Sequence, residues 1–270
     1  MTIWFYQGGS LPRQTRMVAA RQGVVTLKGL FGLCLPELTL PCEIRGLAPF
    51  PSPVPAGQGL EGALAPSHHL LTQEAPLPVC NPRRLYQYFL AGNGVFLVAR
   101  SRDVEVCLPL AVGPIPGLVH CNPSVQFLHP RVPIALVEEM LASAWRAYVQ
   151  GPEERLFYLL CERGHWSLVE PEQEATEESV RACAPTAASW NAVLEGHSHH
   201  RFAAFFSSGD DEAELLDGGC RLFFVVGGFG RQREILVRLC IHGYAWLLPA
   251  DLFLELPSDV QDASWHGGRR

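Results

Sequence analysis

A segment rich in proline and glycine, residues 48–66, limits the folds open to this chain more than any other feature of its sequence. It reads APFPSPVPAGQGLEGALAP. Proline lacks the backbone N–H and fixes φ, so such a segment can form neither a helix nor a central strand. We therefore expect an extended surface loop there, and folded structure in the parts of the chain on either side of it.

The first part of the chain predicts a small β-rich domain. Residues 91–94 (AGNG) are a turn signal, and the apolar runs at 95–99 and 104–108 are typical of strands. Residues 81–90 (NPRRLYQYFL) precede them and indicate a short helix. We expect these elements, with the proline-rich loop, to form an N-terminal domain over residues 1–120.

The second part of the chain alternates helix and strand patterns. Pro133–Tyr148 carries apolar residues at the i, i+3, i+7 spacing of an amphipathic helix. Strand-like runs follow at Leu156–Cys161, Trp166–Val169, Leu222–Val226, Ile235–Leu239 and Tyr244–Leu248. A helix followed by several strands with an inserted helix indicates an α/β (α+β) domain, a mixed β-sheet flanked by helices. We place this domain at residues 121–257 and expect residues 258–270 to be a disordered tail.

Charge and cysteine usage exclude several classes of protein. The formal net charge is −6, so a nucleic-acid partner is not expected. The start of the chain lacks the features of a secretory signal, and no run approaches the ~18 apolar residues of a membrane span. The nine cysteines are odd in number and include no C-x-x-C pair, which argues against a disulfide framework or a cysteine zinc site. We expect a cytoplasmic protein without a membrane partner.

The chemistry of the sequence is concentrated in residues 195–212, which read EGHSHHRFAAFFSSGDDE. His197 and His199 are two residues apart, so on a strand both imidazoles point to the same face and can reach one ion. Ser207 and Asp210 complete the pattern H-x-H-x7-S-x2-D. Two imidazoles and one carboxylate provide three zinc ligands and leave the fourth position open for water, as a catalytic zinc requires. We expect one Zn²⁺ bound by His197, His199 and Asp210.

A hydrolytic zinc site also needs a base, which must approach from a different element. Glu154 stands just before the apolar run Leu156–Cys161, and a carboxylate at the end of a buried strand can lean over a metal on the neighbouring strand. Glu153 is the adjacent alternative. Ser207 is expected to donate a hydrogen bond to the oxyanion of a tetrahedral intermediate.

The same residues also have plainer interpretations. His197 and His199 can be exposed residues of a strand. Asp210 can stabilise the N-terminus of a helix, with Ser207 or Ser208 as its cap. Each of these alternatives is reasonable for one residue, but the joint spacing favours the metal site.

Several neighbours of the motif are expected to have no part in the chemistry. Asp211 is one residue out of register and is expected on the surface, and His200 is expected in a loop. The acidic run Glu170–Glu178 is interpreted as solvated charge. Phe205 and Phe206 are expected to pack in the core under the metal loop.

The pattern H-S-H-x7-S-x2-D, with an upstream Glu at a helix-to-strand junction, resembles the JAB/MPN+ (JAMM) metalloproteases over roughly residues 130–257. These enzymes cut peptide or isopeptide bonds after the C-terminal glycine of ubiquitin and ubiquitin-like proteins. The resemblance implies a JAB/MPN-like fold, zinc ligands at His197, His199 and Asp210, an oxyanion serine at Ser207 and a general base at Glu154. The family usually has proline after the second histidine, where this chain has His200.

A fainter resemblance extends into the first half of the chain. The segments 91–97, 197–211 and 248–253 are similar to the A-protein family of the bacterial PRTRC cassette, which also carries an E1-like (ThiF-type) protein and a small ubiquitin-like protein. It implies a ubiquitin-like substrate, with E1-like and E2-like proteins of the same operon as further partners. We therefore expect a zinc-dependent, deubiquitinase-like isopeptidase or peptidase that acts in deconjugation or in precursor maturation. The alternative is a non-catalytic JAMM-like scaffold that binds a ubiquitin-like protein or its E1-like partner.

Overall fold

The computed structural model describes residues 67–81, 83–151, 153–216 and 219–266, together with the strands β1 (Trp4–Tyr6), β2 (Arg21–Thr26) and β3 (Thr39–Glu43). The chain forms two compact units, one made of residues 1–8 and 129–270 and the other of residues 9–128. The sequence predicts a boundary near residue 120 and a single domain before it. The structure instead assigns the first residues to the C-terminal unit, because β1 pairs with a strand near the end of the chain.

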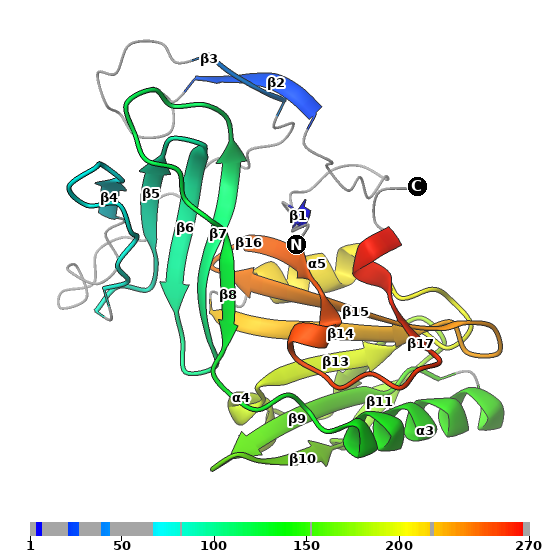
Figure 1. The fold of residues 1–270 in the computed structure, drawn as a ribbon. Coiled ribbons are helices and arrows are strands. Elements are labelled where there is room, and N and C mark those ends of the chain that lie inside the picture. The colour runs from blue at the N-terminus through cyan, green and yellow to red at the C-terminus, as the bar shows by residue number, and fades with distance from the viewer. Residues whose placement is uncertain are drawn as a thin grey trace. The chain divides into compact units, whose positions relative to one another are not determined.

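The C-terminal unit is built on an eight-stranded mixed sheet (Figure 1). Its strands follow the order β1, β16 (Tyr244–Leu248), β15 (Arg233–Ile241), β14 (Cys220–Gly227), β13 (Leu194–Ser198), β9 (Leu156–Glu162) and β10 (His165–Val169), and β17 (Val260–Asp262) pairs with β15 beside this order. A separate two-stranded hairpin consists of β11 (Gln173–Ala175) and β12 (Val180–Ala182).

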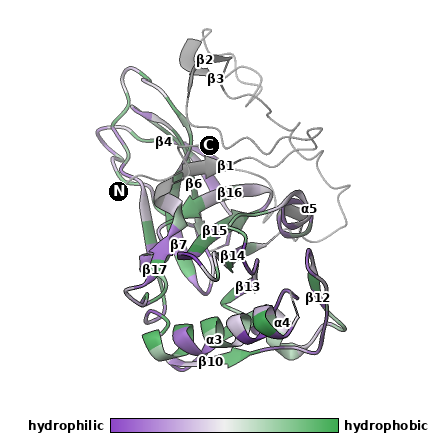
Figure 2. Ribbon diagram, turned by 90° about the vertical axis from the view of Figure 1, so that its right-hand side faces the viewer, coloured by the Kyte–Doolittle hydropathy of each residue, from purple (hydrophilic) through white to green (hydrophobic). Residues whose placement is uncertain are grey.

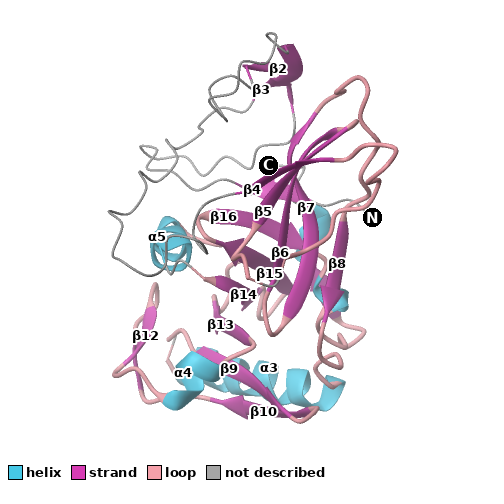
Figure 3. Ribbon diagram, turned by 90° about the vertical axis from the view of Figure 1, so that its left-hand side faces the viewer, coloured by secondary structure: helices cyan, strands magenta, loops and turns pink. Residues whose placement is uncertain are grey.

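Three helices of this unit contact strands of the sheet. Helix α3 (Ile134–Gln150) contacts β10, α4 (Ala187–Asn191) contacts β9, and α5 (Ser208–Leu216) contacts β15 (Figure 3). In α3 the buried residues include Val137, Met140, Leu141 and Ala144, and Figure 2 shows hydrophobic and hydrophilic residues alternating along its ribbon. The amphipathic helix expected after Pro133 is therefore confirmed, with Pro133 as its N-cap.

The central strands are buried on both faces, which explains why their sequences are almost entirely apolar. In β14 every residue from Leu222 to Gly227 is buried, and in β15 every residue from Ile235 to Ile241. The strands expected at Leu156–Cys161, Trp166–Val169, Leu222–Val226, Ile235–Leu239 and Tyr244–Leu248 are all present. Mixed sheets with three α-helices in the described residues agree with the expected α+β class.

A crossover connection positions the segment that carries the metal-binding motif. β13 and β14 are parallel neighbours, and parallel neighbours need a connection that returns the chain to the same end of the sheet. Helix α5 lies within this connection. The residues between β13 and α5 therefore begin at the carboxyl end of β13, beside the end of β14.

Gly196 lies inside β13 at a place where no side chain fits. A Cβ atom there would stand 2.3 Å from the carbonyl oxygen of Phe224 and 2.5 Å from its ring. β13 is hydrogen-bonded to β14 on one side and to β9 on the other, so the backbone has little freedom to move away.

We expect Gly196→Ala to lower the free energy of unfolding by about 1–3 kcal/mol, measured by urea denaturation. Gly151→Ala is the matched control, because a Cβ at Gly151 meets nothing within 4 Å and the backbone there is extended. The control should change stability by less than ~0.5 kcal/mol. Equal losses in the two variants would contradict the steric explanation.

The other unit contains a five-stranded sheet in the order β4 (Ser67–Leu70), β5 (Gln87–Ala91), β6 (Gly94–Arg100), β7 (Val104–Val112) and β8 (Ser124–Phe127), and the separate pair β2–β3. The turn expected at residues 91–94 and the strands expected after it are present. Residues 81–90 do not form the expected helix. The tight turn at Gly92–Asn93 folds the preceding residues onto β6, so Gln87–Ala91 form a buried strand.

The end of the chain also differs from its prediction. β17 pairs in parallel with β15, and a 3₁₀ helix, η2 (Ala263–His266), follows it. The Asp262 carboxylate holds this segment by accepting hydrogen bonds from the backbone N–H groups of Ala250 (2.7 Å) and Ser264 (2.9 Å). The prediction of a disordered tail is therefore wrong for residues 260–266. Residues 267–270 and the proline-rich segment 48–66 lie outside the described residues.

Among the helices of the described ranges, none combines the length and the apolar character that crossing a membrane would demand.

Candidate metal centre

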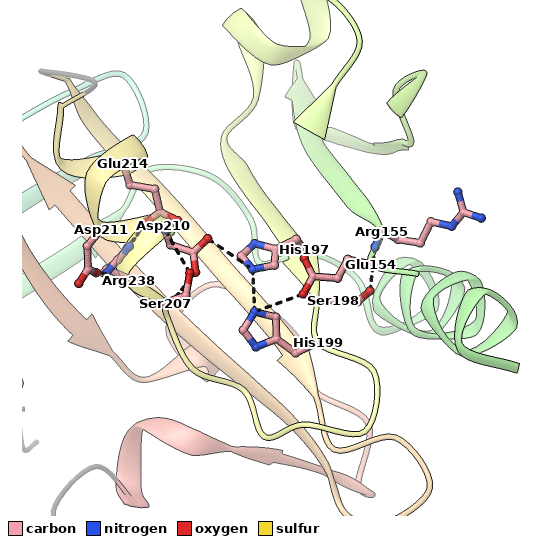
Figure 4. A network of polar contacts seen from close by, with 10 residues as sticks. All are labelled: Glu154, Arg155, His197, Ser198, His199, Ser207, Asp210, Asp211, Glu214 and Arg238. Atoms are coloured by element: carbon pink, nitrogen blue, oxygen red, sulfur yellow. Dashed lines mark hydrogen bonds and ion pairs between the residues drawn. The ribbon is translucent and has the colours of Figure 1, made fainter. Parts of the chain in front are cut away.

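The two histidines of the motif lie at the carboxyl end of β13. His197 is in register with Val225 of β14 and Leu156 of β9. His199 follows the last residue of β13, but its N–H still bonds to the carbonyl oxygen of Val226 (2.7 Å), so it continues the path of the strand. The two side chains consequently point the same way, and their Nε2 atoms are 2.9 Å apart (Figure 4).

Asp210 approaches the histidines from the first turn of α5. Its Oδ1 lies 3.6 Å from Nε2 of His197, and its Oδ2 accepts a hydrogen bond from the N–H of Ser207 (2.6 Å). Ser207 Oγ in turn accepts from the N–H of Asp210 (3.2 Å), which makes a reciprocal cap of the helix. The capping interpretation and the metal-ligand geometry are therefore compatible, because the cap uses one carboxylate oxygen and leaves the other facing His197.

His197, His199 and Asp210 form a group that could hold a metal ion. One ligand atom of each residue lies within 4.8 Å of the others. Burial lowers the pKa of His197, and burial together with the neighbouring His197 lowers that of His199 to about 4. Both imidazoles are thus neutral near pH 7, which is the state that binds a cation. The described ranges contain no second group of this kind. The adjacent histidines His68 and His69 of β4 belong to none.

Glu154 brings a carboxylate to this group from the residues just before β9. Its side chain is buried, and its Oε1 lies 3.8 Å from Nε2 of His199. Burial raises the pKa of Glu154 to about 8, and the negative charges of Asp210 and Glu178 add to the shift. Glu153 is exposed and pairs with Arg155 at 3.8 Å. The structure therefore brings Glu154, and not Glu153, to the histidines.

Buried ion pairs connect β15 to α5, the helix that carries Asp210 of the metal group (His197, His199 and Asp210). The guanidinium of Arg238 in β15 is almost completely buried and donates hydrogen bonds to Asp211 (2.5 Å) and to Glu214 (2.9 Å from Nε). It also lies over the ring of Phe206, 3.8 Å from the ring centre. The expectation that Asp211 is a surface residue is wrong, because its carboxylate pairs with this buried arginine and its side chain is only 14% exposed. The signal in the sequence was a single charge inside the apolar run Ile235–Ile241.

The two phenylalanines before Ser207 have different environments. Phe206 is buried, as expected. Phe205 is 44% exposed, and its ring meets that of His199 edge to face with the centres 4.5 Å apart. The prediction that both pack in the core is therefore wrong for Phe205, which forms an exposed apolar edge of the metal group.

No family model matches the sequence, and no curated protein matches it either. Any conclusion about function therefore rests on the side chains of this site and on the resemblance of its sequence motif.

Proposed function

We propose that this protein is a zinc-dependent hydrolase of the JAB/MPN+ type that cuts the peptide or isopeptide bond after the C-terminal glycine of a ubiquitin-like protein. The observation that carries the proposal is the convergence of His197, His199 and Asp210 with the Glu154 carboxylate, which comes from the segment just before β9. The choice of a ubiquitin-like substrate, with E1-like and E2-like proteins as further partners, rests on the resemblance of the motif.

The donor set fits zinc. Two neutral imidazoles and one carboxylate are the ligand types that zinc takes in hydrolytic sites, and the chain supplies three of them from the end of β13 and the start of α5. Zinc held there would act as a Lewis acid and lower the pKa of water.

Three features of the chain would serve the hydrolysis. Glu154 is placed to take a proton from the attacking water and to deliver it to the leaving amine. The Ser207 hydroxyl accepts a hydrogen bond from the Asp210 N–H, which leaves its own proton free to donate to the carbonyl oxygen of the scissile bond. The exposed ring of Phe205 offers an apolar surface beside His199 for the end of the substrate.

Metal content tests the first part of the proposal. We expect about one zinc per purified chain by elemental analysis. His197→Ala and Asp210→Ala should each lose most of it, because two ligands bind zinc far more weakly than three. His165→Ala is the control, since His165 is exposed on β10 and should leave the zinc content unchanged. Wild-type protein without zinc after reconstitution would contradict the metal assignment.

Cleavage tests the second part. The substrates are ubiquitin-like proteins that end in Gly-Gly, extended by a short peptide or joined to a lysine side chain, and the products are identified by mass spectrometry. We expect one cut, directly after the terminal glycine, that a chelator abolishes and added zinc restores. Zinc binding without cleavage of any substrate in the panel would favour the scaffold alternative.

A further inference from the structure

Ser198 lies between the two histidines and makes an unusual contact with the segment of the base. It is the last residue of β13 and is fully buried. Its N–H donates to the carbonyl oxygen of Arg155 (3.0 Å), and its side-chain Oγ accepts from the N–H of Arg155 (2.9 Å). Figure 4 shows this side chain turned toward Arg155.

The hydroxyl contact replaces one of the two backbone hydrogen bonds of a regular antiparallel pair. In an antiparallel ladder, two bonded residues exchange both N–H···O=C bonds. The register of β13 with β9 ends at His197 and Leu156, so Ser198 and Arg155 would be the next pair. Here the serine hydroxyl accepts the bond that a backbone carbonyl would otherwise accept. The register with β9 goes no further, and the next N–H, that of His199, bonds to Val226 of β14.

Two fixed amides hold Glu154 in place. Its own N–H donates to the carbonyl oxygen of Thr176 (2.9 Å), and the next N–H, that of Arg155, donates to Ser198 Oγ. The hydroxyl therefore connects the segment of the carboxylate directly to the strand that carries both histidines. Without it, the Arg155 N–H would lose its partner and the segment would keep only one bond to the end of β13.

We infer that Ser198 is a positioning residue, whose hydroxyl sets the distance between the Glu154 carboxylate and the metal group by holding the Arg155 amide. The inference rests on the proposed function, because its consequence for rate presupposes that Glu154 is the base. A misplacement of about 1 Å in a reacting group can cost on the order of a hundredfold in rate. The hydroxyl should therefore affect kcat and leave zinc binding and KM unchanged.

Ser198→Thr and Ser198→Val form the matched pair for the test. Both add a methyl group at a buried position, so any packing cost is common to both, and only threonine keeps the hydroxyl. Ser198→Ala removes the hydroxyl without added volume and serves if the larger side chains prevent folding. Ser189→Ala is the control, because its hydroxyl bonds to the backbone of Thr186, where it caps the short helix α4.

Zinc content, kcat, KM and hydrogen exchange at the amides of residues 153–156 are measured for each variant. We expect Val and Ala to lower kcat by about tenfold to a hundredfold, with KM and zinc unchanged and faster exchange at Arg155, and Thr to restore the wild-type values. Wild-type kcat in Ser198→Ala, loss of its zinc, or failure of threonine to restore the rate would overturn the inference. If the wild-type protein cuts no substrate, the proposed function fails, and unchanged exchange at Arg155 would then overturn the positioning role independently.

Discussion

Glu154→Gln is expected to lower kcat by about 10²–10⁴-fold while the protein keeps its zinc, because glutamine has the same shape but cannot accept a proton from water. Glu154 is not one of the three residues of the metal group, so its replacement leaves the donor set of His197, His199 and Asp210 intact. The measurement is the single-turnover rate on a cleavable ubiquitin-like fusion, with zinc determined on the same sample. Full activity in this variant would refute the assignment of the base.

Stability provides an independent readout for the same variant. In the metal-free protein the pKa of Glu154 is raised to about 8 by burial and by neighbouring negative charges, so the fold disfavours the carboxylate at pH 7, whereas a zinc ion at the site would favour it. A neutral amide removes this cost, and metal-free Glu154→Gln should melt at the same temperature as the wild type or higher. Glu153→Gln is the control for rate: its side chain is exposed and points to Arg155, so it should leave kcat unchanged. A large loss of rate in Glu153→Gln alone would reverse the choice between the two glutamates.

The parts of the site that the sequence predicts are those set by local geometry. The i, i+2 spacing of His197 and His199 fixes a common direction because successive side chains on a strand alternate between faces. The spacing of Ser207 and Asp210 fixes their reciprocal bonds because those bonds form within one helical turn. Both relations depend on backbone geometry over a few residues, which the sequence displays directly.

The supporting contacts escaped prediction because they join residues far apart in the chain. Arg238 of β15 donates hydrogen bonds to Asp211 and Glu214 of α5, and no short-range sequence pattern pairs these residues. The acidic run Glu170–Glu178 has exposed glutamates, as expected for solvated charge, but it also contains β11, and the carbonyl oxygen of Thr176 just after β11 accepts a hydrogen bond from the N–H of Glu154. Hydrophobic periodicity says nothing about such backbone partners.

In the fold, too, features set by local sequence were predictable and those set by long-range pairing were not. Central strands such as β14 and β15 were predictable, because burial on both faces demands continuous apolar sequence. The edge strand β1 and the short β17 were missed, since three residues are too few to display a period. Their place in the sheet follows from long-range pairing with β16 and β15.

Arg238→Met is expected to cause a large loss of stability, about 3–5 kcal/mol in the free energy of unfolding. The Arg238 side chain is 1% exposed, and the carboxylates of Asp211 and Glu214 that it binds are 14% and 10% exposed. Methionine fills much of the volume but leaves both carboxylates buried without a cation. Because these acids lie on α5 just after Asp210, zinc affinity should fall as well. Urea denaturation and zinc titration measure the two effects.

The triple variant Arg238→Met, Asp211→Asn, Glu214→Gln separates charge from packing. If the loss comes from unpaired buried carboxylates, neutralising them should recover most of the stability, so the three changes are strongly non-additive. Arg233→Met is the matched control on the same strand: Arg233 pairs with Asp259, which is 59% exposed, and its loss should cost no more than about 1 kcal/mol. If the triple variant is as unstable as Arg238→Met alone, the guanidinium stabilises α5 by its packing on Phe206 and not by its charge, and the ionic account of the anchor is wrong.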